Sequence, residues 1–150
     1  MNFQQWIAGC IIFLSSGSLW SFNCYYTLVK DSCWTNYNVS VDVLDVAAGT
    51  VITTAIVPAG KSWTRLSFGC QPNQKLMYRA KFSPIFWASD AGKTFEAQNY
   101  LSLPAAINPQ DTAWDLSSCY PADFSEVPLP PGATGNCQCD FKSIPAVSTE

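Results

Sequence analysis

Six cysteines follow residue 21 and constrain the fold of this 150-residue chain more than any other feature. An even number of cysteines in an exported protein indicates a disulfide framework, because an oxidising compartment keeps such bridges formed. The six are Cys24, Cys33, Cys70, Cys119, Cys137 and Cys139. A bridge between Cys137 and Cys139 would close a strained ring, so twelve of the fifteen pairings remain. Among these we favour Cys24 with Cys33, and Cys70 and Cys119 with the Cys137/Cys139 pair.

Two other uses of the Cys137-Gln138-Cys139 motif have less support. A zinc site is typically built from two paired cysteine motifs or from cysteines and histidines, and this chain has one such motif and no histidine. A redox pair needs a perturbed thiolate, which nothing in the neighbouring sequence indicates. We therefore predict disulfide cysteines, no metal site and no cofactor.

Residues 1–21 have the build of a cleaved secretory signal peptide, with a polar start, an apolar run over 6–14 and small residues over 15–18. Cys10 ends a motif that resembles a lipid-attachment site, but only nine residues precede it and the apolar run continues beyond it. An uncleaved anchor is the alternative, but the fifteen residues from Trp6 to Trp20 are short against the ~20 that span a bilayer. We expect cleavage after Ser21 and a secreted or periplasmic mature chain without a membrane span.

Apolar and polar side chains alternate over residues 38–103, with the period of two of half-buried strands. Strands are expected at 38–46, 50–57, 62–68, 75–82, 85–88 and 94–103. The second and third are joined by turn residues 58–61, which predicts a hairpin, and the second is apolar on both faces, which predicts a central strand. Little helix is expected, because no stretch has an apolar period of 3.6. The pattern predicts an all-β fold, an antiparallel β-sandwich or small barrel.

The single β domain is expected to span residues 22–142, with a proline-rich part at 104–142 and a flexible tail at 143–150. Proline interrupts ladder pairing, so 104–142 is predicted to be an irregular wrap pinned by disulfides. Charge adds a second expectation, since residues 50–100 carry a net charge of plus four and residues 101–150 one of minus five. We expect the acidic segment to fold over the basic one, the alternative being two solvated faces.

Histidine is absent from the chain, which excludes histidine-dependent nucleophiles, general bases and metal sites. Carboxylate chemistry is what remains. Asp111 and Asp115 are four residues apart and would share one face of a helical turn, as in a paired-carboxylate site, whereas the simpler interpretation is that Asp111 caps a turn. We predict no catalytic residue.

Binding is the function that the surface composition favours. Only 13% of the residues are charged and 14% are aromatic, and aromatic enrichment is typical of interfaces. The candidate binding residues are Trp63, Arg65, Lys75, Arg79 and Lys81. The isoelectric point of about 4.7 argues against nucleic acid, whose partners are strongly basic.

The sequence therefore predicts an exported, non-catalytic binding or structural protein, an accessory component of a cell-envelope or secreted assembly with a protein partner. A secreted carbohydrate-binding module is the alternative, since aromatic side chains also stack on sugars. A carboxylate-dependent hydrolase and a protease inhibitor with its loop at Pro128–Gly135 have less support. The oligomeric state stays open.

Overall fold

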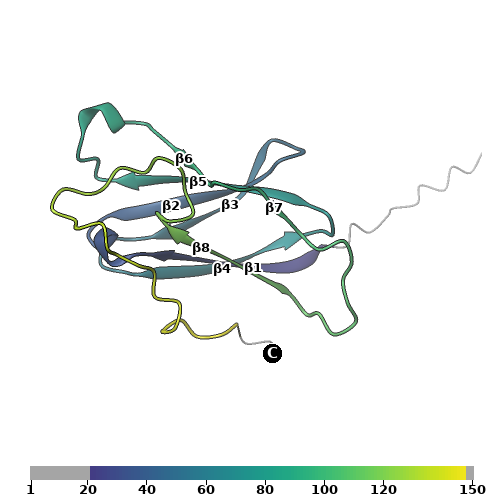
Figure 1. Ribbon diagram of the computed structural model, residues 1–150. Helices are drawn as coiled ribbons and strands as arrows, with labels where there is room; N and C mark the ends of the chain where they lie inside the picture. Colours follow the sequence, from purple (N-terminus) through teal and green to yellow (C-terminus); the bar gives the residue numbers. More distant parts are fainter. Residues whose placement is uncertain (1–20, 148–150) are drawn as a thin grey trace, which may run out of the picture.

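The computed structural model describes residues 21–147, which form a two-layer β-sandwich (Figure 1). This confirms the predicted all-β fold class. The expected leader up to residue 20, including Cys10, lies outside the described residues, as do residues 148–150 of the expected tail. No helix among residues 21–147 is long and apolar enough to cross a membrane.

One layer is a three-stranded sheet with the order β4-β1-β8. Its strands are β1 (Phe22–Lys30), β4 (Trp63–Cys70) and β8 (Trp114–Tyr120). β1 pairs antiparallel with β4 and parallel with β8. The strands that flank β1 are therefore the two edges of this sheet.

The other layer is a five-stranded sheet with the order β3-β2-β5-β6, in which β7 also pairs with β5. Its strands are β2 (Asn38–Asp45), β3 (Thr50–Val57), β5 (Lys75–Ser83), β6 (Phe95–Glu96) and β7 (Leu101–Ser102). All of its pairings are antiparallel. Short 3-10 turns, η1 (Ser32–Trp34) and η2 (Ala88–Asp90), follow β1 and precede β6.

The core fills the space between the two sheets, and the sequence alternation places its residues correctly. The side chains of Val39, Val41 and Val43 in β2 are fully buried. In β5 the side chains of Leu76, Tyr78, Ala80 and Phe82 are buried, while the residues between them face outward or are half-buried. Trp34 of η1 closes one end of the core, packing edge-to-face on Tyr37, Phe82 and Tyr120.

The predicted hairpin over residues 50–68 is wrong. β3 belongs to the five-stranded sheet and β4 to the three-stranded sheet, so the turn at Pro58–Ser62 carries the chain from one layer to the other. β3 is also an edge strand instead of a central one, and its apolar residues Val51 and Ile56 are exposed. An apolar run on both faces indicates a central strand only if both faces are covered, and here only one face packs on the core.

Strands also lie outside the predicted strand-rich range 38–103. β1 precedes it, and β8 lies inside the expected irregular wrap, between Pro109 and Pro121. Conversely, residues 85–88 form no strand, and the expected strand at 94–103 is reduced to β6 and β7. Residues 121–147 carry no named strand, and an isolated bridge pairs Phe124 with Ala97.

Three disulfides join all six cysteines after residue 21, as the even count predicts, but the favoured pairing is largely wrong. Cys24 of β1 bonds Cys70 of β4, Cys33 of η1 bonds Cys137, and Cys119 of β8 bonds Cys139. Only the bond from Cys119 to the Cys137/Cys139 pair was expected. Sequence distance misled the rest, because the β1–β4 pairing brings Cys24 and Cys70 together from 46 residues apart.

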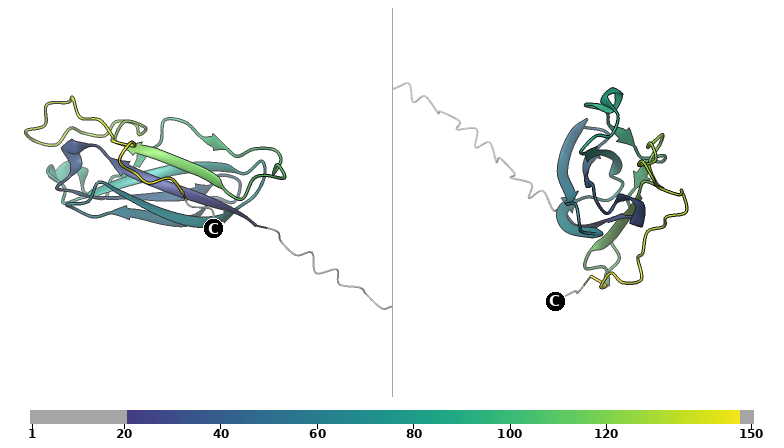
Figure 2. Two further views of the ribbon diagram at one scale, coloured as in Figure 1. Left: turned by 90° about the horizontal axis from the view of Figure 1, so that it is seen from below. Right: turned by 90° about the vertical axis from the view of Figure 1, so that its left-hand side faces the viewer.

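The C-terminal segment 121–147 is an irregular wrap pinned by Cys137 and Cys139, as expected. Figure 2 shows it crossing the three-stranded sheet in the view from below. The charges do not hold it there: the two ion pairs among the described residues are Arg79–Asp42 and Lys93–Asp90, and neither involves the acidic segment after residue 100. Disulfides and backbone hydrogen bonds dock the wrap instead, among them Ser125 N–H to Glu96 O at 2.9 Å.

Candidate functional site

The five candidate binding residues lie on two different sheets. Trp63 and Arg65 belong to β4 of the three-stranded sheet, whereas Lys75, Arg79 and Lys81 belong to β5 of the five-stranded sheet. In β5 they alternate with buried core residues, and in β4 they alternate with Leu66, which is half-buried and packs against the core, so they face the outer sides of two separate layers. They do not form one continuous patch.

The outward residues of β4 have intramolecular partners. The Arg65 guanidinium lies 5.5 Å from the centroid of the Trp63 ring, and its Nε donates to Thr27 Oγ1 at 2.8 Å. A cavity of about 170 Å³ beside Arg65 is shared with Phe141 and Ile144 of the C-terminal wrap. The side chains of Trp63 and Arg65 are half-buried. Trp63 is therefore less accessible to a partner than the sequence indicated.

The outward residues of β5 have different environments. Arg79 pairs with Asp42 of the neighbouring β2, 3.8 Å between Nη2 and Oδ2, while Lys81 is exposed. Lys75 places its ammonium 4.4 Å from the centroid of the ring of the exposed Tyr100, which is a cation–π contact. Among the five candidate binding residues, Lys75 contacts a residue, Tyr100, that lines the cavity described next.

A cavity of about 260 Å³ opens at one edge of the sandwich, where β8 ends one sheet and the segment from Ala97 to Leu101 ends the other. We call it the edge cleft. Its polar lining comes from four parts of the chain: Tyr78 of β5, Gln98 to Tyr100, Ser117 and Ser118 of β8, and Asp123. The cleft therefore combines two aromatic rings with hydroxyl, amide and carboxylate groups, the mixture typical of small-molecule sites.

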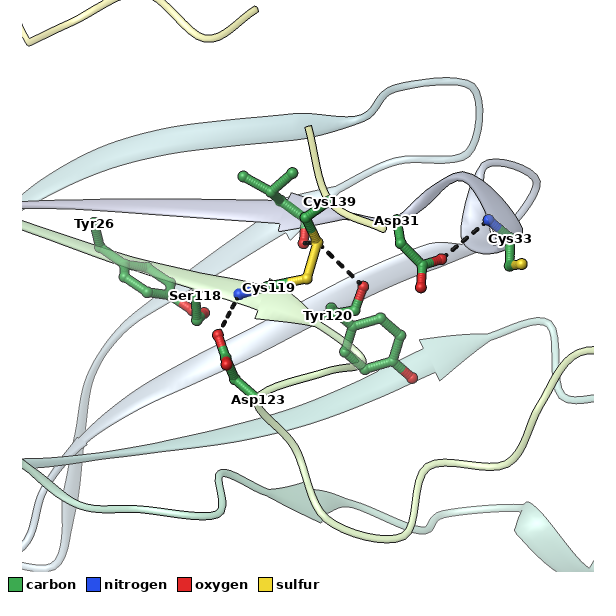
Figure 3. The surroundings of a disulfide bond; sticks show 9 residues. Tyr26, Asp31, Cys33, Ser118, Cys119, Tyr120, Asp123 and Cys139 are labelled. Carbon is green, nitrogen blue, oxygen red and sulfur yellow. Dashed lines mark hydrogen bonds between the residues drawn. A yellow bond between two sulfur atoms is a disulfide. The ribbon is translucent and has the colours of Figure 1, made fainter. Parts of the chain in front are cut away.

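Two buried residues that carry hydroxyl groups, Tyr78 and Ser118, line the edge cleft. Tyr26 and Ser118 are hydrogen-bonded to each other inside the core, and Figure 3 shows their side chains meeting beside β8. Tyr78 is only 6% exposed, and its hydroxyl has no hydrogen-bond partner among the described residues. Because buried hydroxyls in proteins are nearly always hydrogen-bonded, the Tyr78 hydroxyl is a group that a bound molecule or water would satisfy.

The outer wall of the edge cleft is held in place by a turn at Asp123. Its carboxylate accepts from Cys119 N–H at 2.6 Å, which Figure 3 shows next to the Cys119–Cys139 disulfide. The Gln98 amide donates to the carbonyls of Ala122 and Phe124 at 3.2 and 3.3 Å. The turn is thereby fixed to the wall opposite β8, so the cleft is preformed.

A second candidate surface lies at the end of the sandwich, on the connection between β5 and β6. This connection, which contains η2, stands out from the body of the molecule in Figure 1. Trp87 is 56% exposed and Ile85 is 42% exposed, whereas Phe86 between them packs on Trp34 and Phe82. We call residues 85–87 the apolar loop.

Two other groups of acidic and cysteine residues were considered as catalytic or metal-binding sites. Asp115 lies in β8 and Asp111 accepts from Asn108 N–H at 3.0 Å in a turn before it, so the two do not share a helical face. Asp31, Cys33 and Cys137 come within 4.8 Å of one another, but the two sulfurs are bonded to each other and cannot act as thiolate ligands. Neither group makes a catalytic or metal site.

Sequence reasoning missed both surfaces. Tyr78 looks like any other inward residue of a strand, and no local signal connects it to Ser117, Ser118 and Asp123, some forty residues later. The apolar loop has a sequence signal, since residues 85–88 are an apolar run, but such a run also predicts a strand, and the structure has none there. No protein-family model, curated protein or solved structure matches the chain.

Proposed function

We propose that this protein is an exported, non-catalytic binding protein that contacts a protein partner within a cell-envelope or secreted assembly. The observation that carries the proposal is the exposure of Trp87 and Ile85 on a loop whose middle residue, Phe86, is anchored in the aromatic core. A large apolar side chain on a rigid base is the usual form of an interface anchor, because little conformational entropy is lost on binding.

The disulfides and the position of β1 support export. Three bridges fit a protein that folds in an oxidising compartment. β1 begins at Phe22, directly after the expected cleavage site, so removal of residues 1–21 would leave the strand whole. Secretion or a periplasmic location follows from the expected signal peptide and is part of the proposal.

Export is tested by mass spectrometry of the non-reduced protein from fractionated cells that express the full chain. We expect a mature N-terminus at Phe22, three disulfides and no acyl mass. Intact Met1 on a cytosolic protein with free thiols would remove the basis for an envelope or secreted partner.

Partner binding is tested by placing a photo-crosslinking amino acid at position 87 of the full chain and irradiating intact cells of the natural host. The matched control carries the same amino acid at position 141, because Phe141 is also aromatic and exposed but lies in the C-terminal wrap. We expect one discrete crosslinked protein from position 87 that is missing from position 141. Identical crosslinking patterns from the two positions would contradict a partner site on the apolar loop.

Carbohydrate binding is a second candidate function, because the edge cleft sets the exposed aromatic ring of Tyr100 beside amide, carboxylate and hydroxyl groups. This candidate concerns a different surface from the apolar loop.

A further inference from the structure

We propose that the edge cleft binds one neutral sugar ring, either a free monosaccharide or the end of a glycan, with the Tyr78 hydroxyl as its innermost hydrogen-bonding group. This inference deepens the second candidate function and rests on it. It does not depend on the apolar loop.

Tyr78 lines the edge cleft, and its buried hydroxyl has no hydrogen-bond partner among the described residues. The Tyr78 ring is fixed by stacking on Tyr26, with centroids 4.7 Å apart and planes inclined by 24°. The hydroxyl of Tyr26 is bonded to Ser118 and makes no hydrogen bond to the Tyr78 hydroxyl. A tyrosine hydroxyl keeps its proton at neutral pH, and burial raises the pKa of Tyr78 further, so this hydroxyl is able to donate as well as accept.

The rim of the edge cleft has partners for both the C–H groups and the hydroxyl groups of a sugar ring. Tyr100 is 57% exposed and contacts Lys75, and an aromatic ring at this position offers a flat apolar surface to the C–H groups of a sugar. Asn99, Ser117 and Asp123 are exposed polar residues of the same cavity. Between them they offer donors and acceptors, which sugar hydroxyls need because each both donates and accepts.

The charges around the edge cleft favour a neutral ligand. None of the described residues that line it is a lysine or arginine, and the Asp123 carboxylate would repel phosphate or carboxylate groups. The Lys75 ammonium at the Tyr100 ring disfavours cations at the rim. The volume of about 260 Å³ lies just below the ~300–1,000 Å³ of sites for drug-sized ligands, which points to a single ring.

The experiment is a protein-observed NMR titration of the disulfide-bonded chain, residues 22–150, with glucose, galactose, mannose and N-acetylglucosamine, together with a glycan array. We expect saturable binding of at least one of these sugars, alone or as the end of an arrayed glycan, with shifts at Tyr100 and Ser117. Binding of the free sugar identifies a monosaccharide site, whereas binding on the array alone identifies a glycan end. Spermidine and glucose 6-phosphate are the charged comparison ligands. Tighter binding of either, or no binding of any neutral sugar in both formats, would overturn the proposal.

Matched variants separate the Tyr78 hydroxyl from general effects on the core. Tyr78→Phe keeps the ring and its stacking but removes the hydroxyl, and we expect about a tenfold loss of affinity. Tyr120→Phe is the control, because the Tyr120 hydroxyl is also buried and without a partner among the described residues but does not line the edge cleft. Equal affinities of the two variants would also overturn the proposal.

Two more variants keep the outcome clear. Asn99 is exposed, so Asn99→Ala tests the rim without disturbing the core, and weaker sugar binding is expected. Trp87→Ala should bind sugar as the unmodified chain does, since Trp87 does not line the edge cleft. Sugar binding without a crosslink at position 87 would contradict only the partner site on the apolar loop. A crosslink at position 87 without sugar binding would contradict only the sugar site in the edge cleft.

Discussion

Tyr26 of β1 stacks on Tyr78 of β5, with ring centroids 4.7 Å apart, and this contact joins the two sheets through the middle of the core. The pair is polar as well as aromatic, because each ring carries a hydroxyl into the interior. Tyr120 adds a third buried hydroxyl near Trp34. The core of this protein therefore contains three tyrosine hydroxyls, and burial disfavours the ionisation of each.

Alkaline pH is expected to destabilise the fold. Burial raises the pKa of Tyr26, Tyr78 and Tyr120 above the ordinary value of about 10. Above about pH 10 the unfolded chain loses tyrosine protons that the folded chain keeps, so the free energy of unfolding falls, by at most about 1.4 kcal/mol per pH unit for each tyrosine. Urea unfolding at several pH values from about 8 to 11 measures this slope.

The Tyr78→Phe variant is the control for that slope, and it should lose stability less steeply than the unmodified chain above about pH 10. The comparison is needed because burial lowers the pKa of Lys30, which raises stability as pH rises towards about 10.5 and so opposes the tyrosines. Identical slopes for the two chains would show that Tyr78 ionises equally in both states.

Lys30→Met is expected to destabilise the fold although it removes a buried charge. Lys30 is 2% exposed, and its ammonium donates to the carbonyls of Tyr37 at 2.6 Å and Pro58 at 3.0 Å. Methionine fills the space but leaves these acceptors without a donor, at a cost of about 2–4 kcal/mol. Chemical unfolding measures the loss, and exposed Lys81→Met should stay within about 0.5 kcal/mol of the unmodified chain. An unchanged midpoint for Lys30→Met would mean that the carbonyls find other donors.

The Cys119–Cys139 bond is expected to hold the C-terminal wrap and not the sandwich. In a Cys119→Ser/Cys139→Ser variant, limited proteolysis should cut within residues 125–147 while the two-sheet core stays resistant. In a Cys24→Ser/Cys70→Ser variant the bridge between β1 and β4 is lost instead, and we expect a global loss of about 2–5 kcal/mol. The reverse assignment of cuts and stability losses would contradict this division.

Truncation to alanine is expected to reduce stability strongly at one tryptophan and hardly at all at another. Trp34 is fully buried among four aromatic rings, so Trp34→Ala should cost about 3–5 kcal/mol. Trp87→Ala should change stability by no more than about 0.5 kcal/mol, because the side chain is mostly exposed. Thermal unfolding of both variants checks this, and a large loss in Trp87→Ala would assign that residue to the core instead of to an interface.

The candidate sites show how far local patterns reach. The alternation over Lys75–Ser83 predicted which side chains are buried, but burial says nothing of whether the Tyr78 hydroxyl finds a partner, which depends on Tyr26 and Ser118 from other strands. The aromatic content predicted binding, and the strand pattern favoured Trp63 as the exposed tryptophan, yet Trp63 is half-buried and Trp87 is 56% exposed. A short apolar run has no periodicity that separates a strand from an exposed loop.

The sequence by itself determined the all-β class, the inward faces of β2 and β5 and the presence of a disulfide framework, because alternation and cysteine number act locally or through composition. Only the tertiary structure decided that β3 and β4 belong to different sheets, that β8 lies parallel to β1, and which cysteines meet. Each strand offers backbone groups on both edges that are satisfied equally well by several partners, so the choice depends on how the whole core packs.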